Sequence, residues 1–189
     1  MESALIVSHT EKSTAFFTEM LNAASVKQVA ALQSCGEARR LVMERDFDLV
    51  VVNAPLRDES GESFSRHIAS KFISQVILVV KSEYFDAVSA SCEDYGVLTV
   101  SKPVNRSVFW SALALSKAAR RMITRIQDEN ARLKQKIEDI RVVDRAKCML
   151  ISFVDMSERE AHRYIEKQAM DLRCSKREIA EGILRTYES

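Results

Sequence analysis

Short apolar runs alternate with helical patterns along the first hundred residues. The runs are rich in Val, Ile and Leu and mix in few polar positions, which is typical of strands buried on both faces of a parallel sheet. Strands are predicted at Ala4–Val7, Val26–Leu32, Leu49–Val52, Val76–Val80 and Val97–Val100. Helices are predicted between them at Ser13–Leu21, Gly36–Arg45, Glu62–Lys71 and Tyr84–Asp94. This alternation predicts an α/β domain with a doubly wound, five-stranded parallel sheet.

Beyond Lys102-Pro103 the pattern becomes purely helical. No Gly or Pro occurs between Val104 and Glu181. A heptad repeat begins at residue 123, with Ile123, Asn130 and Ile137 at position a and Ile126, Leu133 and Ile140 at position d. A buried Asn at position a specifies a parallel, two-stranded register. The pattern therefore predicts a dimerising coiled coil. The alternative is a solvated amphipathic helix that lies on the chain's own domain.

Charges across the predicted coiled coil give mixed support. In a parallel dimer, Glu129 at position g would face Lys134 at position e of the second copy, which is attractive. Lys136 would face Arg141 in the same way, which is repulsive.

The last part of the chain predicts three short helices that share a small core. The first covers Val143–Val154, the second runs to about Leu172 and the third to about Tyr187. Ser157 with Glu160, and Ser175 with Glu178, have the spacing of capping boxes at the start of the second and third helices. Gly182 is expected to permit a close helix contact. The predicted core residues are Ala146, Met149, Leu150, Ala161, Ile165, Ala169, Ile179, Ala180, Ile183 and Leu184.

Charge is distributed unevenly and suggests three pieces. The net charge is −4 over residues 1–105, +5 over residues 106–143 and zero over residues 144–189. We therefore expect an acidic front domain at 1–105, a connecting helix at 106–142 and a tail at 143–189. The whole chain has a net charge of +1, so it is not one of the strongly basic proteins that coat nucleic acid.

Composition also bears on the location of the protein. No apolar run approaches the length of a membrane span, and the start of the chain lacks the basic segment of a signal peptide. The four cysteines are scattered without a CxxC pair, as expected of reduced thiols. The sequence therefore predicts a cytoplasmic protein with no membrane partner.

The tail resembles the ANTAR family, the RNA-binding antitermination modules of bacterial regulators. The resemblance covers about 45 residues of the tail. Its motifs are Asp144-Arg145-Ala146-Lys147 in the first helix, Ser157-Glu158, Ala161 and Ala169-Met170 in the second, and Ile179-Ala180 in the third. The sequence departs from the family pattern at Cys148, His162 and Glu166.

The front domain resembles a response-regulator receiver, which has the flavodoxin-like fold. The matching pieces are Ala4–Val7, Gly36-Glu37-Ala38, Phe47-Asp48-Leu49-Val50 and Lys102-Pro103. A receiver needs an acidic pair after its first strand to hold Mg²⁺, but Ser8 and His9 stand there. Asn53 stands in place of the nucleophilic Asp, and its neutral amide cannot form an acyl phosphate. With only Lys102 retained, the resemblance implies a pseudo-receiver that takes no phosphate, in which Lys102 is expected to pair with an acidic neighbour or a carbonyl.

Candidate RNA-contacting residues follow from the ANTAR resemblance. Phosphates of a hairpin loop attract Lys and Arg, and its splayed bases can stack on aromatic rings. The basic candidates are Arg145, Lys147, Arg163, Lys167, Arg173, Lys176 and Arg177, of which the last three cluster before the final helix. Tyr164 and Tyr187 could stack on bases, although the spacing of Tyr164 favours the core.

Other chemistry finds little support in the sequence. His9 at a strand end could sense pH or a ligand, but a lone, exposed loop histidine, as we expect His9 to be, usually does neither. His67 and His162 have no second ligand at metal spacing, so we expect no metal. No dinucleotide, P-loop or nucleophile-elbow motif occurs, so we expect no enzyme and no cofactor.

The resemblances together imply a dimeric transcription antiterminator. ANTAR dimers bind paired hairpins of a leader mRNA, which prevents the terminator from folding. Control would come from a regulatory protein partner, a small ligand or a change of oligomer, and not from phosphorylation. Two alternatives remain open. The first is a protein–protein adaptor whose tail no longer binds RNA, which Cys148, His162 and Glu166 would support. DNA binding is the second and is disfavoured, because no helix-turn-helix pattern precedes a basic recognition helix.

Overall fold

The computed structural model describes residues 1–187. They fold as two compact units, Met1–Thr124 and a second unit that begins at Arg125. The helix α5 (Arg106–Val154) contributes its first part to the front unit and its last part to the second. Each unit has its own hydrophobic core.

The front unit is built on the five-stranded parallel sheet that the sequence predicts. Its strands are β1 (Ser3–Val7), β2 (Gln28–Leu32), β3 (Leu49–Asn53), β4 (Gln75–Lys81) and β5 (Leu98–Lys102). They lie in the order β2-β1-β3-β4-β5, and each neighbouring pair is parallel. The order changes direction beside β1, so the carboxyl ends of β1 and β3 flank the position where doubly wound sheets bind ligands.

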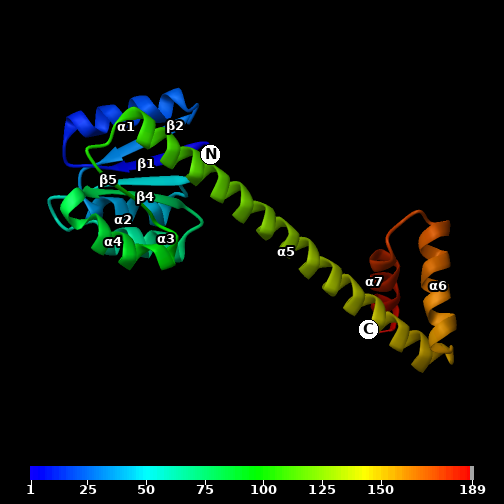
Figure 1. Ribbon diagram of the computed structural model, residues 1–189. Coiled ribbons are helices and arrows are strands. Elements are labelled where there is room, and N and C mark those ends of the chain that lie inside the picture. Colours follow the sequence, from blue (N-terminus) through cyan, green and yellow to red (C-terminus); the bar gives the residue numbers. More distant parts are fainter. Residues whose placement is uncertain (188–189) are drawn as a thin grey trace. The chain divides into compact units, whose positions relative to one another are not determined.

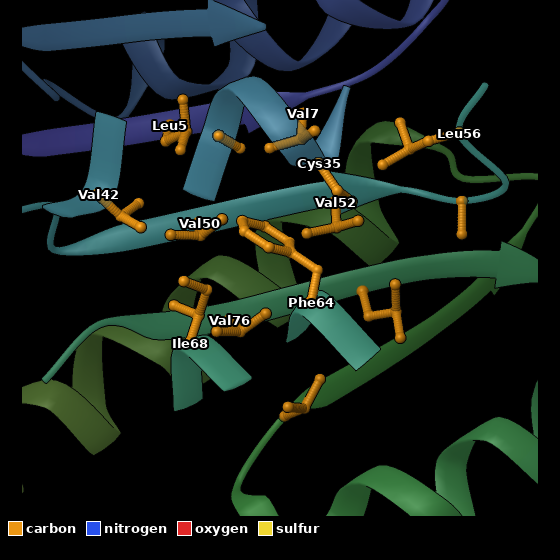
Figure 2. Packing of buried hydrophobic residues seen from close by; sticks show 14 of the residues in the cluster. Leu5, Val7, Cys35, Val42, Val50, Val52, Leu56, Phe64, Ile68 and Val76 are labelled. Atoms are coloured by element: carbon orange, nitrogen blue, oxygen red, sulfur yellow. The ribbon is translucent and has the colours of Figure 1, made fainter. Parts of the chain in front are cut away.

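Helices cover both faces of this sheet (Figure 1). The helix α1 (Glu11–Ala23) and the start of α5 pack on one face, where Phe17 and Phe109 meet with ring centroids 5.1 Å apart. The helices α2 (Cys35–Glu44), α3 (Glu62–Lys71) and α4 (Phe85–Cys92) pack on the other. Figure 2 shows Phe64 of α3 among Val50, Val52 and Val76 of the sheet. Burial on both faces explains why the central strands consist of continuous apolar runs.

Three expectations for the front unit need correction. The strands β2 and β5 are only partly buried, because an edge strand has a neighbour on one side only. The helix expected at Tyr84–Asp94 is shorter, since short 3₁₀ turns at Ser82–Tyr84 and Glu93–Tyr95 flank α4. His9 is half-buried, and its Nδ1 atom is buried without a hydrogen-bond partner in residues 1–187.

The first turns of α5 are anchored to the front unit. Asn105 caps the helix by accepting a hydrogen bond from Val108 N at 2.9 Å. Arg120 forms an ion pair with Asp48, the residue before β3, and donates to the carbonyl of Ile73. Lys117 donates to the carbonyl of Ala24 at 3.0 Å. The contacts of Lys117 and Arg120 fix α5 to the end of the sheet where the strands begin.

The prediction of three separate tail helices is wrong for the first of them. Residues 143–154 continue α5 without a break, and α5 is 49 residues long. The physical reason is that neither Gly nor Pro interrupts the helical sequence there. The other two helices form as expected, α6 at Glu158–Asp171 and α7 at Lys176–Tyr187.

The second unit is a small three-helix core with capped helices. Ala146 and Leu150 of α5 pack with Ile165 of α6 and Ala180 of α7. Both capping boxes are present: Ser157 N donates to Glu160 at 2.9 Å, and Ser175 N donates to Glu178 at 2.7 Å.

Two expectations for this unit are wrong. Tyr164 is exposed, because Ile165 beside it takes the inward position on α6. Gly182 makes no close contact, since a Cβ atom built there meets nothing within 4 Å. No helix among residues 1–187 has both the length and the apolar character to cross a membrane.

Candidate functional site

The carboxyl ends of β1 and β3 bring Ser8 and Asn53 together. Both side chains are buried, and Asn53 Nδ2 donates a hydrogen bond to Ser8 Oγ at 3.0 Å. The strands are paired directly, with Val7 opposite Val52. The position where the receiver resemblance calls for carboxylates therefore holds a neutral hydroxyl and a neutral amide bonded to each other.

Lys102 lies at the end of β5 beside this pair. Its Nζ donates to the carbonyl of Ala54 at 2.5 Å, which confirms that the ammonium pairs with a carbonyl. Burial lowers the pKa of Lys102, and the nearby charge of Lys81 lowers it further. Ser82 follows β4 and donates to the carbonyl of Lys102, so its hydroxyl is engaged with the backbone.

The residues present do not fit the Mg²⁺ that a phosphorylatable receiver holds. Mg²⁺ prefers carboxylate and other oxygen ligands in an octahedral arrangement. Ser8, His9 and Asn53 offer no carboxylate, and an ammonium lies beside them. Among residues 1–187, no three His, Cys, Asp or Glu side chains gather where they could hold a metal ion.

In the second unit, Lys147, Lys176 and Arg177 line one cavity of about 330 Å³ between α5, α6 and α7. Each of them is paired with carboxylates. Lys147 Nζ lies 2.8 Å from Asp144 and 3.3 Å from Glu158. The hydrogen bond to Asp144 raises the pKa of Lys147 most strongly.

The other two basic residues of this cavity are bound just as closely. Arg177 Nη1 lies 2.7 Å from Asp139, and Arg177 Nε lies 2.7 Å from Glu181. Lys176 donates to Glu166, which lowers the pKa of that carboxyl. His162 Nε2 also approaches Glu166, at 3.4 Å. Two residues that depart from the family pattern, His162 and Glu166, thus belong to one polar network with Lys176.

A second group of candidates lies along one side of α6. Arg163, Tyr164 and Lys167 line an open hollow of about 430 Å³ together with Asp155, Met156 and Glu160. Arg163 and Lys167 stand one helical turn apart, and both side chains lie at the surface. Tyr164 is 40% exposed, so its ring is accessible for stacking.

The remaining candidates stand apart from these two groups. Arg145 is exposed on α5. Arg173 is exposed in the turn after α6, where its φ of 52° reverses the chain, and it does not line the cavity with Lys176 and Arg177. Tyr187 stacks on Phe153 with ring centroids 5.5 Å apart and 23° between the planes. Sequence reasoning missed Phe153, because an aromatic residue at the end of an apolar run gives no signal of exposure, yet 64% of it is exposed.

The heptad residues of α5 present their apolar side chains outward. Ile123, Ile126, Leu133, Ile137 and Ile140 are all exposed, and Asn130 lies exposed among them. Isolated exposed apolar residues are common, but exposed apolar residues repeated at heptad spacing are the pattern of coiled-coil helices.

Comparison with known proteins supports both resemblances. Residues 131–184 match the ANTAR domain family model. The chain is 28% identical over 168 residues to the transcriptional regulatory protein PdtaR of Mycobacterium tuberculosis, from strain H37Rv and from strain CDC 1551. The alignments cover 89% of this chain and 82% of PdtaR.

Solved structures resemble the front unit. One is the signal receiver domain of an HD domain-containing protein from Pseudomonas fluorescens Pf-5, with 18% identity and a TM-score of 0.57 over 66% of this chain and 94% of that one. Another is a CheY-like receiver domain from Methylobacillus flagellatus, with 19% identity and a TM-score of 0.52 over 61% of this chain and 98% of that one. The front unit therefore has the fold of response-regulator receivers, and residues 131–184 match the ANTAR domain.

Proposed function

We propose that this protein is a cytoplasmic, dimeric transcription antiterminator that binds paired hairpins of a leader mRNA and is controlled without phosphorylation of its front unit. The observation that carries the proposal is the ANTAR match at residues 131–184, together with the likeness to a transcriptional regulatory protein over most of the chain. Binding of two linked hairpins would hold the transcript in a form that keeps the terminator from folding.

The second unit offers suitable chemistry for a looped RNA. Arg163, Lys167 and the exposed ring of Tyr164 line one hollow on α6. Two cations one helical turn apart suit backbone phosphates, and a tyrosine ring in the same hollow suits an unstacked base. We expect this group to contact RNA first, because it presents two cations and a ring to solvent in one hollow, whereas Lys147, Lys176 and Arg177 are held by carboxylates.

Dimerisation would give this weak, local surface its affinity. The exposed heptad residues and Asn130 favour a parallel pair of α5 helices. Two tails held by one coiled coil would meet two linked hairpins at a high effective concentration, which raises affinity without any new interaction.

Phosphorylation independence rests on the Asn53–Ser8 pair. An amide is no nucleophile toward a phosphodonor, and the pair offers no carboxylate for Mg²⁺. The front unit would then respond to a protein, a ligand or a change of oligomer.

The ion-paired cations favour a second candidate function, a protein–protein adaptor. Lys147, Lys176 and Arg177 all bind carboxylates of the same unit. A tail that neutralises its own cations would bind RNA poorly and could instead present a mixed-charge surface to a protein.

Ultraviolet cross-linking of the full chain to RNA in cells, followed by sequencing, separates the two functions. The antiterminator is expected to enrich leader transcripts that contain two adjacent stem-loops before a terminator. An adaptor would give no enrichment of such leaders over total RNA, and that result would reject the proposal. A variant without the tail, ending at residue 124, serves as the background control.

A further inference from the structure

Beside the Asn53–Ser8 pair lies a cavity of about 410 Å³ at the carboxyl end of the sheet. The polar lining comes from Lys12, Ser13, Asn53 and Lys102, and much of the apolar part comes from Phe16, Phe17 and Val104. This volume and this mixture, a few polar groups in an apolar wall, are typical of small-molecule sites. The location is also the one at which doubly wound sheets bind their ligands.

The polar lining offers several hydrogen-bond donors to a ligand. Lys102 contributes an ammonium with two donors left after its bond to Ala54 O. Asn53 Nδ2 donates one of its two N–H groups to Ser8, so the other can donate to a ligand. Lys12 and Ser13 stand in the first turn of α1, where no side chain caps the free backbone N–H groups. The N-terminus of a helix favours negative charge.

The cations of the cavity have no acidic neighbour in its lining. None of the residues that line the cavity is acidic. The nearby charge of Lys81, another cation, lowers the pKa of Lys102 further. A half-buried ammonium that lacks an anionic partner is costly, and an anion from solution would remove that cost.

We propose that this cavity binds a small organic anion directly, with an anionic head group at Lys102, Asn53 and the start of α1 and an apolar body against Phe16 and Val104. A receiver holds Mg²⁺ and a phosphoryl group here, whereas Asn53 and Ser8 remove the negative charge that would repel a free anion. The inference takes from the proposed function only that residue 53 accepts no phosphoryl group. It assigns an input for a regulator that phosphorylation does not control.

Titration of the ¹⁵N-labelled full chain, without RNA, tests the proposal by NMR. The probes are phenyl phosphate, benzoate and inorganic phosphate. Phenyl phosphate or benzoate is expected to shift the side-chain amide of Asn53 and the backbone amides of Lys12 and Ser13 in a saturable way. The two organic probes show whether the head group is a phosphate or a carboxylate. Inorganic phosphate is expected to bind more weakly because it has no apolar body.

Two variants tie the binding to this cavity. Asn53→Asp keeps the shape but adds a negative charge, and Lys102→Gln removes the ammonium. Each is expected to weaken binding roughly tenfold or more. Lys71→Gln on α3 removes an exposed charge away from the cavity and is expected to change nothing.

Absence of saturable shifts with every probe would overturn the inference, as would equal binding to both cavity variants and the wild type. Tighter binding of inorganic phosphate than of both organic probes would contradict the apolar part of the site. Because the titration contains no RNA, its failure would not contradict the RNA-binding proposal. A failure to bind RNA would likewise not contradict the anion site.

Discussion

Asn53 Nδ2 donates to Ser8 Oγ across the carboxyl ends of two central strands, at 3.0 Å. This neutral pair predicts that acetyl phosphate with Mg²⁺ leaves the protein unlabelled, as checked by intact mass spectrometry. Asn53→Asp is also expected to stay unlabelled, because Ser8 and His9 still supply no carboxylate for Mg²⁺. A receiver with its carboxylates intact is the positive control. Stable labelling of the wild-type front unit would contradict this part of the account.

Asp48 connects the start of the sheet to α5, and it predicts a pH dependence of stability. Burial acts to raise the pKa of Asp48, but hydrogen bonds from Glu2 N and Ser3 N, with Arg120, lower it overall. A carboxyl whose pKa is lower in the folded state stabilises the fold above its unfolded pKa of about 3.9 and loses this effect as the pH falls below it. Asp48→Asn should therefore cost about 2 kcal/mol at pH 7.

The difference between Asp48→Asn and the wild type should shrink as the pH falls from about 5 toward about 3. Urea unfolding followed by the fluorescence of Trp110, which lies on α5 in the front unit, measures this difference. Asp46→Asn removes an exposed carboxylate two residues away and should have little effect at any pH. An Asp48→Asn cost that does not change with pH would show that the charge of Asp48 is unimportant.

The sheet and the helix caps could be predicted from the sequence, because both leave local signals in it. Continuous apolar runs identified all five strands, and the Ser157 and Ser175 boxes formed as their spacing predicted. Ser8 and Asn53 were assigned to one site only through the resemblance to a receiver. The cavity beside them could not be predicted, because it depends on how Phe16 and Val104 pack against the strand ends.

Other features of the site depended on tertiary structure that periodicity cannot report. Nothing in the sequence shows that Asp139 binds Arg177 across 38 positions. The spacing of Tyr164 favoured the core, but a three-helix core of this size has room for few large rings, and small residues such as Ala146 and Ala161 fill it. The sequence predicted a separate helix at Val143–Val154, yet no Gly or Pro stands before residue 143 to break α5.

Asn130 predicts a specific response of the proposed coiled coil. Asn130→Ile should strengthen association of the α5 helices and loosen the preference for two strands, since an Ile stripe suits more than one oligomer. Sedimentation velocity over a range of concentrations measures both effects. Ala131→Ile adds the same side chain at position b, outside the stripe, and should leave association unchanged. A monomer in both the wild type and Asn130→Ile would reject the coiled coil.

Arg163 and Lys167 predict how RNA affinity depends on salt. Replacing both by Gln should weaken binding and reduce the slope of log affinity against log salt by about 0.7 for each phosphate that the protein no longer neutralises. The Gln substitutions of Arg40 and Lys71 remove the same charge from the front unit and form the matched control. An unchanged slope in the Arg163 and Lys167 variant would place the RNA elsewhere on the tail.

The central claim is that the tail of this protein binds looped RNA in pairs, and filter binding of the full chain to a leader RNA with two linked hairpins tests it most directly. We predict tight binding that falls as salt rises and that drops by about a hundredfold or more when either hairpin is deleted, as expected when two tails act through one dimer. Equal, weak binding to one hairpin, two hairpins and an unstructured RNA, by a protein that remains folded, would contradict the account.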